Sequence, residues 1–140
     1  MSISYKIILN YVKDLSLEIP GADALIESRK NISNYTLDLD ISSNPIKNNM
    51  IEVNTKLIYL DKKKSIKKSY FEIIYSTIIQ INEKKPKKEE LKKLILCDLQ
   101  IKIFPKLKKI FQEILRMSGF PSLEIKKDID FEKIYNQKIS

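Results

Sequence analysis

The sequence predicts an α+β fold, in which a four-stranded antiparallel Greek-key sheet is followed by a long kinked helix and a short C-terminal helix. In residues 5–81, four segments alternate apolar and polar side chains with the period of two that a strand imposes. After residue 89 the apolar residues recur every three or four positions, as on one face of a helix. Strands and helices that are segregated along the chain favour a sheet covered on one face by helices.

The first strand is predicted from Tyr5 to Ile19. Its odd-numbered residues are nearly all apolar: Tyr5, Ile7, Leu9, Tyr11, Lys13, Leu15, Leu17 and Ile19. If the alternation is unbroken, this set faces the core, including the stretch from Tyr11 to Ile19. The opposite face then presents two carboxylates, Asp14 and Glu18, which is unexpected in a chain of net charge +8.

Three further strands are predicted at Tyr35–Ile41, Met50–Leu60 and Ser69–Ile81, which are rich in β-branched and aromatic residues. The second and third are separated by turn signals at Asn44-Pro45 and 47–49, and the third and fourth by residues 61–68. Residues 21–34 are too many for a hairpin and predict a crossover over the sheet. Three strands linked by hairpins and one joined by a long connection make a Greek key.

A helical stripe of apolar residues runs from Glu89 to Ser118. Pro105 interrupts it and predicts a kink, or two helices that meet there. Gly119 is expected to end the helix, with Pro121 just beyond. Asp130 is a plausible N-cap for a short last helix.

A chain of 140 residues suits a single domain spanning residues 1–140. The sequence contains no apolar run that resembles a secretory signal or a transmembrane helix, because its longest uncharged run, residues 73–82, has only ten residues. We therefore expect a cytoplasmic protein without direct membrane insertion. Cys97 lies among leucines and is expected to be a buried core thiol.

Lysines dominate the positive charge, since Arg29 and Arg116 are the only arginines. Five lysines lie within residues 62–68 and six within residues 84–93. These clusters fit solvated turns, or alternatively a phosphate-binding surface of a small basic nucleic-acid-binding protein. The scarcity of arginine and the acidic strand faces speak against nucleic acid as a partner.

Residue sets for enzyme chemistry are missing from the sequence. It has no histidine, two glycines and one cysteine, and therefore no P-loop, dinucleotide fingerprint or metal-spaced cysteine cluster. The acidic pairs Asp38 with Asp40 and Glu89 with Glu90 are more typical of solvated faces than of acid–base catalysis. We expect a binding protein without catalytic residues, cofactor or metal.

Four segments resemble the SecB family of protein-export chaperones. YVKDLSLEIPGA at Tyr11–Ala22 resembles the first strand of that family, and TLDLDI at Thr36–Ile41 its second strand. FPKLKKI at Phe104–Ile110 is similar to the family's FPxxR helix motif, and SGFPSLEIKKDIDFEKIY at Ser118–Tyr135 to its C-terminal motif. The resemblance covers nearly the whole chain, in order and with family spacing.

This resemblance implies an ATP-independent holdase that binds unfolded precursor proteins, keeps them competent for translocation and passes them to the SecA motor. It implies a homotetramer, built as a dimer of dimers in which paired sheets sandwich the long helices. SecA docks on the acidic outer sheet face of such proteins, and the matching positions here are Asp14, Glu18, Tyr70 and Glu72. All four fall on the polar sets of their strands, and long-range attraction to the basic tail of SecA gives them a physical role.

Clients need an apolar groove that accepts many sequences, because burial of apolar area is indifferent to sequence. The candidate lining residues come from the crossover and from the elements it covers: Leu25, Ile26, Ile32, Tyr35 and Phe120. The same residues also fit an ordinary core.

The chain departs from the family pattern in several places. Its crossover has no tryptophan, with Asn31 or Ile32 near that position, and Lys108 replaces the motif arginine. Its positive net charge contrasts with the acidic character of most members. These departures bear on client preference and on attraction to SecA. A SecB-like chaperone dedicated to one partner, such as an antitoxin, is the alternative function.

Overall fold

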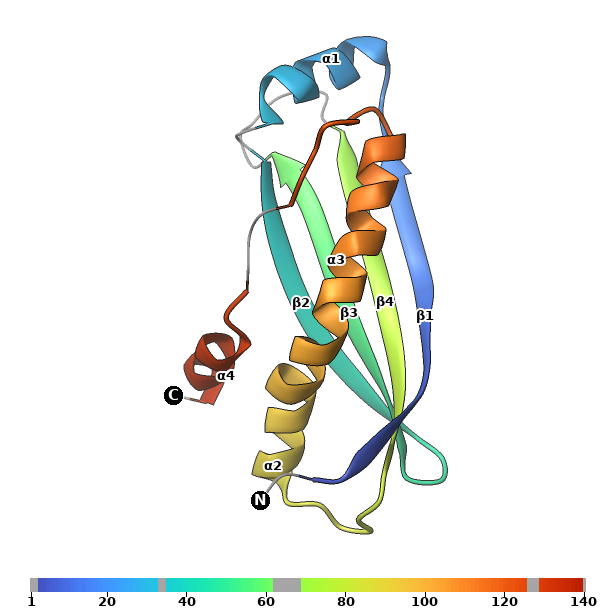
Figure 1. Ribbon diagram of the computed structural model, residues 1–140, viewed down its shortest axis with the longest axis vertical. Helices are drawn as coiled ribbons and strands as arrows, with labels where there is room; N and C mark the ends of the chain where they lie inside the picture. Colours follow the sequence, from blue (N-terminus) through green and yellow to red (C-terminus); the bar gives the residue numbers. More distant parts are fainter. Residues whose placement is uncertain (1–2, 33–34, 62–68, 126–128, 140) are drawn as a thin grey trace.

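A computed structural model describes residues 3–32, 35–61, 69–125 and 129–139. Its strands are β1 (Tyr5–Glu18), β2 (Tyr35–Ile46), β3 (Met50–Asp61) and β4 (Tyr70–Ile81). They form one antiparallel sheet in the order β1-β4-β3-β2 (Figure 1). Because β1 lies beside β4 and reaches β2 only through a long connection, the predicted Greek key is confirmed.

The hairpin between β2 and β3 turns at residues 47–49, where Asn48 and Asn49 adopt φ angles of 63° and 60°. Asparagine tolerates this left-handed conformation better than most residues. The turn predicted at Asn44-Pro45 is wrong, because β2 continues through Pro45, which is paired with Ile51. β2 is an edge strand, and there a proline removes no necessary hydrogen bond from the sheet. Of the turn predicted at 61–68, all but Asp61 lies outside the described residues.

Strand β1 contains two β-bulges, where one extra residue is inserted relative to β4, at Ile8 and at Lys13. The prediction of one unbroken alternation from Tyr5 to Ile19 is therefore wrong in the middle of the strand. Between the bulges the faces exchange, so that Leu9 and Tyr11 lie on the outer face with their partners Ile78 and Ser76.

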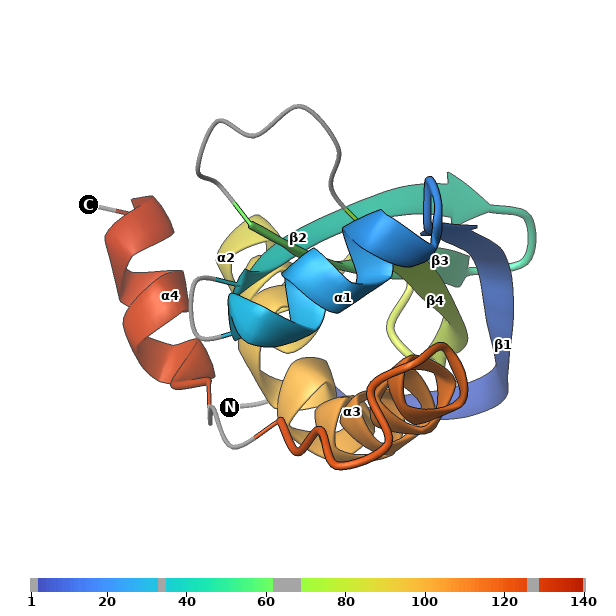
Figure 2. The ribbon, with the colours of Figure 1, turned by 90° about the horizontal axis from the view of Figure 1, so that it is seen from above.

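The connection between β1 and β2 forms helix α1 (Ala22–Lys30), which lies across one end of the sheet (Figures 1 and 2). The sequence pattern did not predict this helix, because its buried face consists of the small residues Ala24 and Ser28. The Ser28 hydroxyl donates to the Ala24 carbonyl at 2.7 Å and lies 3.0 Å from the Ser69 hydroxyl. The Tyr35 hydroxyl lies 2.9 Å from Ser28 Oγ and 3.1 Å from the Ser69 carbonyl oxygen, and it thereby ties α1 to the sheet.

The long helical column comprises α2 (Lys88–Lys93), a π-helical segment (Leu94–Asp98) and α3 (Leu99–Met117). The alternative of two helices that meet at Pro105 is wrong, because α3 continues through this residue. The irregular part of the column is the π-helical segment. Pro105 lies on the exposed side of α3. The carbonyl that a proline leaves without its usual partner belongs to Ile101, which is also exposed, so the disruption stays outside the core.

The core lies between one face of the sheet and α3, which crosses that face diagonally (Figure 1). The buried stripe of α3 repeats every four residues, through Leu99, Ile103, Leu107, Phe111 and Leu115. A buried polar pair joins helix and sheet, since the Thr55 hydroxyl donates to Gln100 Oε1 at 3.1 Å. The amide of Gln100 in turn donates to the carbonyl of Ile95 in the π-helical segment, at 3.2 Å.

The predicted C-terminal end of α3 and the predicted N-terminal end of the last helix are both confirmed. Gly119 follows α3 with a φ of 106°, and Phe120 N–H donates to the Leu115 carbonyl at 3.2 Å, which closes the helix as in a Schellman motif. Asp130 caps α4 (Phe131–Ile139), because its Oδ1 accepts a hydrogen bond of 3.1 Å from Lys133 N–H. No helix among the described residues is both long and apolar enough to cross a membrane.

Candidate functional site

The outer face of the sheet, opposite α3, carries all four residues predicted for SecA docking. Glu18 pairs with Tyr70 across β1 and β4, and Ser16 pairs with Glu72, so these side chains share one face. Asp14 belongs to the same face, about 13 Å from Glu18 along the strand. Asp14 and Glu18 are exposed. The two strands thus bring together side chains that lie more than fifty residues apart in the sequence.

Two more carboxylates extend this face across the sheet, and sequence reasoning did not include them in the docking site. Asp40 of β2 pairs with Lys56, which pairs with Ile74, the partner of Asp14. Asp38 stands opposite Ile58 in the neighbouring row. We call the five acids the acidic sheet corner: Asp14, Glu18, Asp38, Asp40 and Glu72. The alternation of β2 had placed its two acids on one face, but only the strand order shows that this face continues that of β1 and β4.

Within the acidic sheet corner, Glu72 is already engaged by its neighbours. Its Oε1 accepts a hydrogen bond of 2.7 Å from the Tyr70 hydroxyl and lies 3.3 Å from Lys56 Nζ. Burial, followed by the hydrogen bond to Glu72, raises the pKa of Tyr70 to about 12, so Tyr70 stays a neutral donor. A partner would therefore meet Asp14 and Glu18 as the more available charges.

A hydrogen-bonded cluster around Glu52 holds the second bulge of β1 beside the acidic sheet corner. Glu52 accepts from Lys13 Nζ at 2.8 Å, from the Tyr11 hydroxyl at 2.6 Å and from Asn54 Nδ2 at 3.1 Å. These hydrogen bonds, with that of Lys13 the most important, lower the pKa of Glu52 to about 2. Lys13 is the extra residue of the bulge, so the cluster fixes the point at which Asp14 turns to the outer face.

Replacing Glu52 by glutamine is expected to lower the free energy of unfolding at pH 7 by about 1 to 2 kcal/mol, after allowance for solvent screening. Because the folded-state pKa of Glu52 is depressed, its contribution is present above its ordinary pKa of 4.5 and is lost as the pH falls toward 2. Urea denaturation at pH 7, 4 and 3 measures this, and the variant should lose less stability on acidification than the parent. Glu83→Gln, in an exposed loop, is the control. Equal behaviour of the two variants would contradict the assigned role of Glu52.

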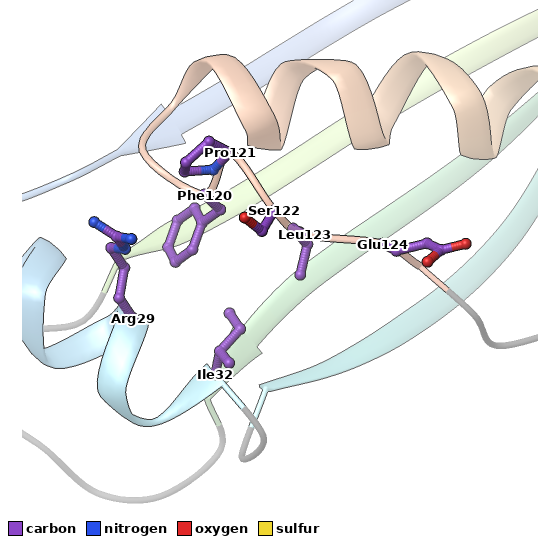
Figure 3. A pocket seen from close by; sticks show the side chains of 7 residues that line it. All are labelled: Arg29, Ile32, Phe120, Pro121, Ser122, Leu123 and Glu124. Atoms are coloured by element: carbon purple, nitrogen blue, oxygen red, sulfur yellow. The ribbon is translucent and has the colours of Figure 1, made fainter.

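A hollow of mixed polarity lies between α1 and the segment that follows α3, with a volume of about 400 Å³ (Figure 3). Its apolar wall comes from Ile32, Phe120, Pro121 and Leu123, and Arg29, Ser122 and Glu124 complete the lining. The Phe120 ring packs edge-on against Phe71 of β4 with centroids 5.4 Å apart, which fixes the floor of the hollow to the core.

Two of the five residues predicted for the client groove, Ile32 and Phe120, line this hollow. Leu25 packs against the turn at Gly119, and Ile26 is 54% exposed on α1. Tyr35 is buried beneath α1 and contributes to the core instead. The sequence did not predict the charged lining residues Arg29 and Glu124, because their places in the hollow depend on how α1 packs against the segment after α3.

The described lysine-rich segment lies apart from both surfaces. Residues 84–93 form the connection after β4 and the start of the helical column, at the end of the sheet opposite α1 (Figure 1). Residues 62–68 lie outside the described part of the chain. Cys97 is 1% exposed, as predicted, and burial raises the pKa of its thiol.

Comparison with known proteins adds a family and a fold. The family described as "Preprotein translocase subunit SecB" matches residues 2–140. A putative protein-export protein SecB of Pelagibacter ubique is 44% identical, over 99% of both chains. Protein-export protein SecB of Mesorhizobium japonicum is 27% identical over 98% of this chain and 80% of its own. That of Rickettsia bellii is 28% identical over 93% of this chain and 84% of its own.

Among solved structures, a similar fold is found in a SecB-like chaperone of Mycobacterium tuberculosis, in complex with a peptide from an antitoxin. The TM-score is 0.66, and the match covers 87% of this chain and 86% of that chain at 10% identity. At this identity the likeness concerns the fold alone.

Proposed function

This chain belongs to the SecB family of protein-export chaperones, and from this premise we propose that it holds unfolded precursor proteins without ATP and delivers them to SecA. The family match over residues 2–140 is the observation that carries the proposal. The function needs no catalytic residues, cofactor or metal, and we propose that the protein acts in the cytoplasm without inserting into the membrane. Nucleic acid is not among the proposed partners.

Client binding is supported by the apolar wall of the hollow. Its wall of Ile32, Phe120 and Leu123 can bury an apolar side chain of an extended polypeptide. Burial of apolar area contributes about 25 cal/mol per Å² whatever the sequence, which suits a protein that must accept many clients. A folded client hides such side chains, so a binder of this kind retains the unfolded chain by mass action.

Docking of SecA is supported by the acidic sheet corner. The partner implied by the family is the basic, zinc-bearing tail of SecA. Five carboxylates on one sheet face, with Lys56 the cation that lies in the same rows, offer that tail a local negative field in an otherwise positive molecule. We propose Asp14, Glu18, Tyr70 and Glu72 as the centre of this docking site.

A refolding assay tests the holdase function. The protein, in several-fold molar excess, should slow the refolding of a reduced, unfolded secretory precursor in the absence of ATP. Ile32→Asp should weaken this effect, because it places a charge in the hollow, whereas Ile46→Asp, at the exposed far end of β2, should not. If the wild-type protein leaves the refolding rate unchanged, the proposed function is wrong.

Assembly into a homotetramer, as a dimer of dimers, is supported by apolar side chains that the single chain leaves exposed. On the helix side of β1 these are Val12, Leu15 and Leu17, between 42% and 44% exposed. On α3, Ile101 is 52% and Met117 79% exposed. Exposed apolar side chains of this size are typical of an interface between subunits.

The solution mass should therefore be about four times the 16.4 kDa of one chain, measured by light scattering. Replacing Leu15 and Leu17 together by glutamate should lower the mass, because burying these charges at an interface is costly. Ser42→Glu on the exposed edge strand β2 is the control. A wild-type monomer would contradict the tetramer, and an unchanged mass in the double variant would contradict this choice of surface.

A chaperone dedicated to one partner is the second candidate, favoured by the fold shared with the SecB-like chaperone in complex with an antitoxin peptide. The two functions differ in their partners. A dedicated chaperone would protect one protein and ignore SecA, whereas an export chaperone would retard several unrelated precursors and bind SecA.

A further inference from the structure

The hollow beneath α1 carries opposite charges at its two ends. In Figure 3 the Arg29 side chain stands at one end beside Phe120, and Glu124 stands at the other, with Ile32 and Leu123 between them. Arg29 is one of two arginines in the chain. The other, Arg116, donates from Nε to the Leu123 carbonyl at 2.7 Å and thereby supports the wall of the hollow.

The position of Arg29 is fixed by its neighbour in the sequence. Ser28 is buried and bonded to Ser69, and the Tyr35 hydroxyl reaches both residues. This anchor holds the last turn of α1 at a constant distance from the sheet. The backbone of Arg29 is therefore placed before any ligand binds, which reduces the entropy lost on binding.

The guanidinium of Arg29 has no carboxylate partner among the described residues. An arginine fork presents paired N–H donors that match the two oxygens of a carboxylate. Arg29 is exposed, so such a contact has the modest strength of a surface ion pair. The side chain therefore offers an acidic group a partner that no carboxylate of the described residues occupies.

We infer that Arg29 selects client segments in which an acidic residue lies next to the apolar side chain that fills the hollow. The inference rests on the proposed client-binding function and adds a chemical preference to it. In an extended client, side chains two residues apart point the same way at about 7 Å. An aspartate or glutamate two positions from the buried side chain can thus reach Arg29.

The test compares two fluorescein-labelled peptides of equal length with the same central phenylalanine. One carries glutamate two positions before and after the phenylalanine, and the other carries lysine at both places. Binding is followed by fluorescence anisotropy. The wild-type protein should bind the glutamate peptide about fivefold more tightly, the size typical of one partly exposed ion pair. The ratio should shrink with added salt.

Two matched variants assign the preference to one side chain. Arg29→Glu should abolish or reverse the ratio, whereas Lys30→Glu, an equal change of charge on the next residue of the same helix, should leave it within about twofold. Lys30 is exposed and does not line the hollow. Because the readout is a ratio between two peptides, a general loss of stability would not move it.

Each outcome has a distinct meaning. If both peptides bind equally, or Lys30→Glu changes the ratio as much as Arg29→Glu, the role of Arg29 is wrong. If the role of Arg29 is wrong but both peptides bind and Ile32→Asp weakens the binding of both, the hollow is still the client site. If neither peptide binds, or Ile32→Asp has no effect on either, the hollow is not the client site and the proposed binding site fails with it.

Discussion

Reversing the two exposed carboxylates of β1 in the variant D14K/E18K is expected to weaken binding to SecA by at least about tenfold. Both side chains belong to the acidic sheet corner and are exposed. Two lysines would replace attraction to a basic tail by repulsion, and like charges brought together across an interface are strongly unfavourable. Titration calorimetry with purified SecA, at low and at physiological salt, measures the loss.

The matched control is the variant E89K/E90K, which reverses two neighbouring acids at the start of α2, at the other end of the sheet. Both double variants change the net charge by the same amount. If the acidic sheet corner is the docking site, only D14K/E18K should lose affinity. Equal losses would show that SecA senses the overall charge, and no loss in either would place the docking site elsewhere.

Replacing Gly119 by alanine is expected to lower the free energy of unfolding by about 3 kcal/mol. Gly119 has a φ of 106°, a conformation that residues with a Cβ rarely adopt. An added Cβ would also lie 2.7 Å from Cδ1 of Leu25, so the Leu25 side chain would have to shift. Strain and overcrowding each cost about 1 to 3 kcal/mol. Urea denaturation measures the total.

The effect of G119A should extend to client binding, because Gly119 immediately precedes Phe120 in the wall of the hollow. The other glycine provides the control. Gly21 has an extended backbone, and a Cβ added there would meet no atom within 4 Å, so Gly21→Ala should change little. G119A should cost less in a Leu25→Ala background than in the parent, by the part of the loss that is due to crowding. Equal stability of G119A and G21A would contradict this account.

Local chemistry made the helix ends predictable from the sequence. A helix terminus has free backbone groups, and few residue types can satisfy them. A glycine after one apolar stripe and an aspartate before the next stripe are therefore informative signals. Elements that depend on packing were harder to predict. Helix α1 buries alanine and serine instead of a stripe of large residues, and the irregular part of the long helix falls at 94–98, where no proline or glycine marks it.

The candidate site was predictable only as far as strand alternation reaches. Asp14, Glu18 and Glu72 follow from the polar faces of single strands, but Asp38 and Asp40 join them because β2 follows β3 in the sheet. The charged ends of the hollow, Arg29 and Glu124, come from segments about ninety residues apart whose contact the sequence does not encode locally. Tyr35 was assigned to the groove from its place in the chain, yet its hydroxyl is an anchor beneath α1.

The two bulges of β1 behave as a pair of compensating insertions. Side-chain direction repeats every two residues, so the extra residue at Lys13 restores the phase that the extra residue at Ile8 had changed. A relative that had lost one of them would turn either the first half of the strand or the carboxylates of Asp14 and Glu18 to the opposite side. A relative that had lost both bulges would keep the first half of the strand and the two carboxylates on their present sides. During divergence of the family, the length of this strand between its two ends is thus constrained to change by an even number of residues.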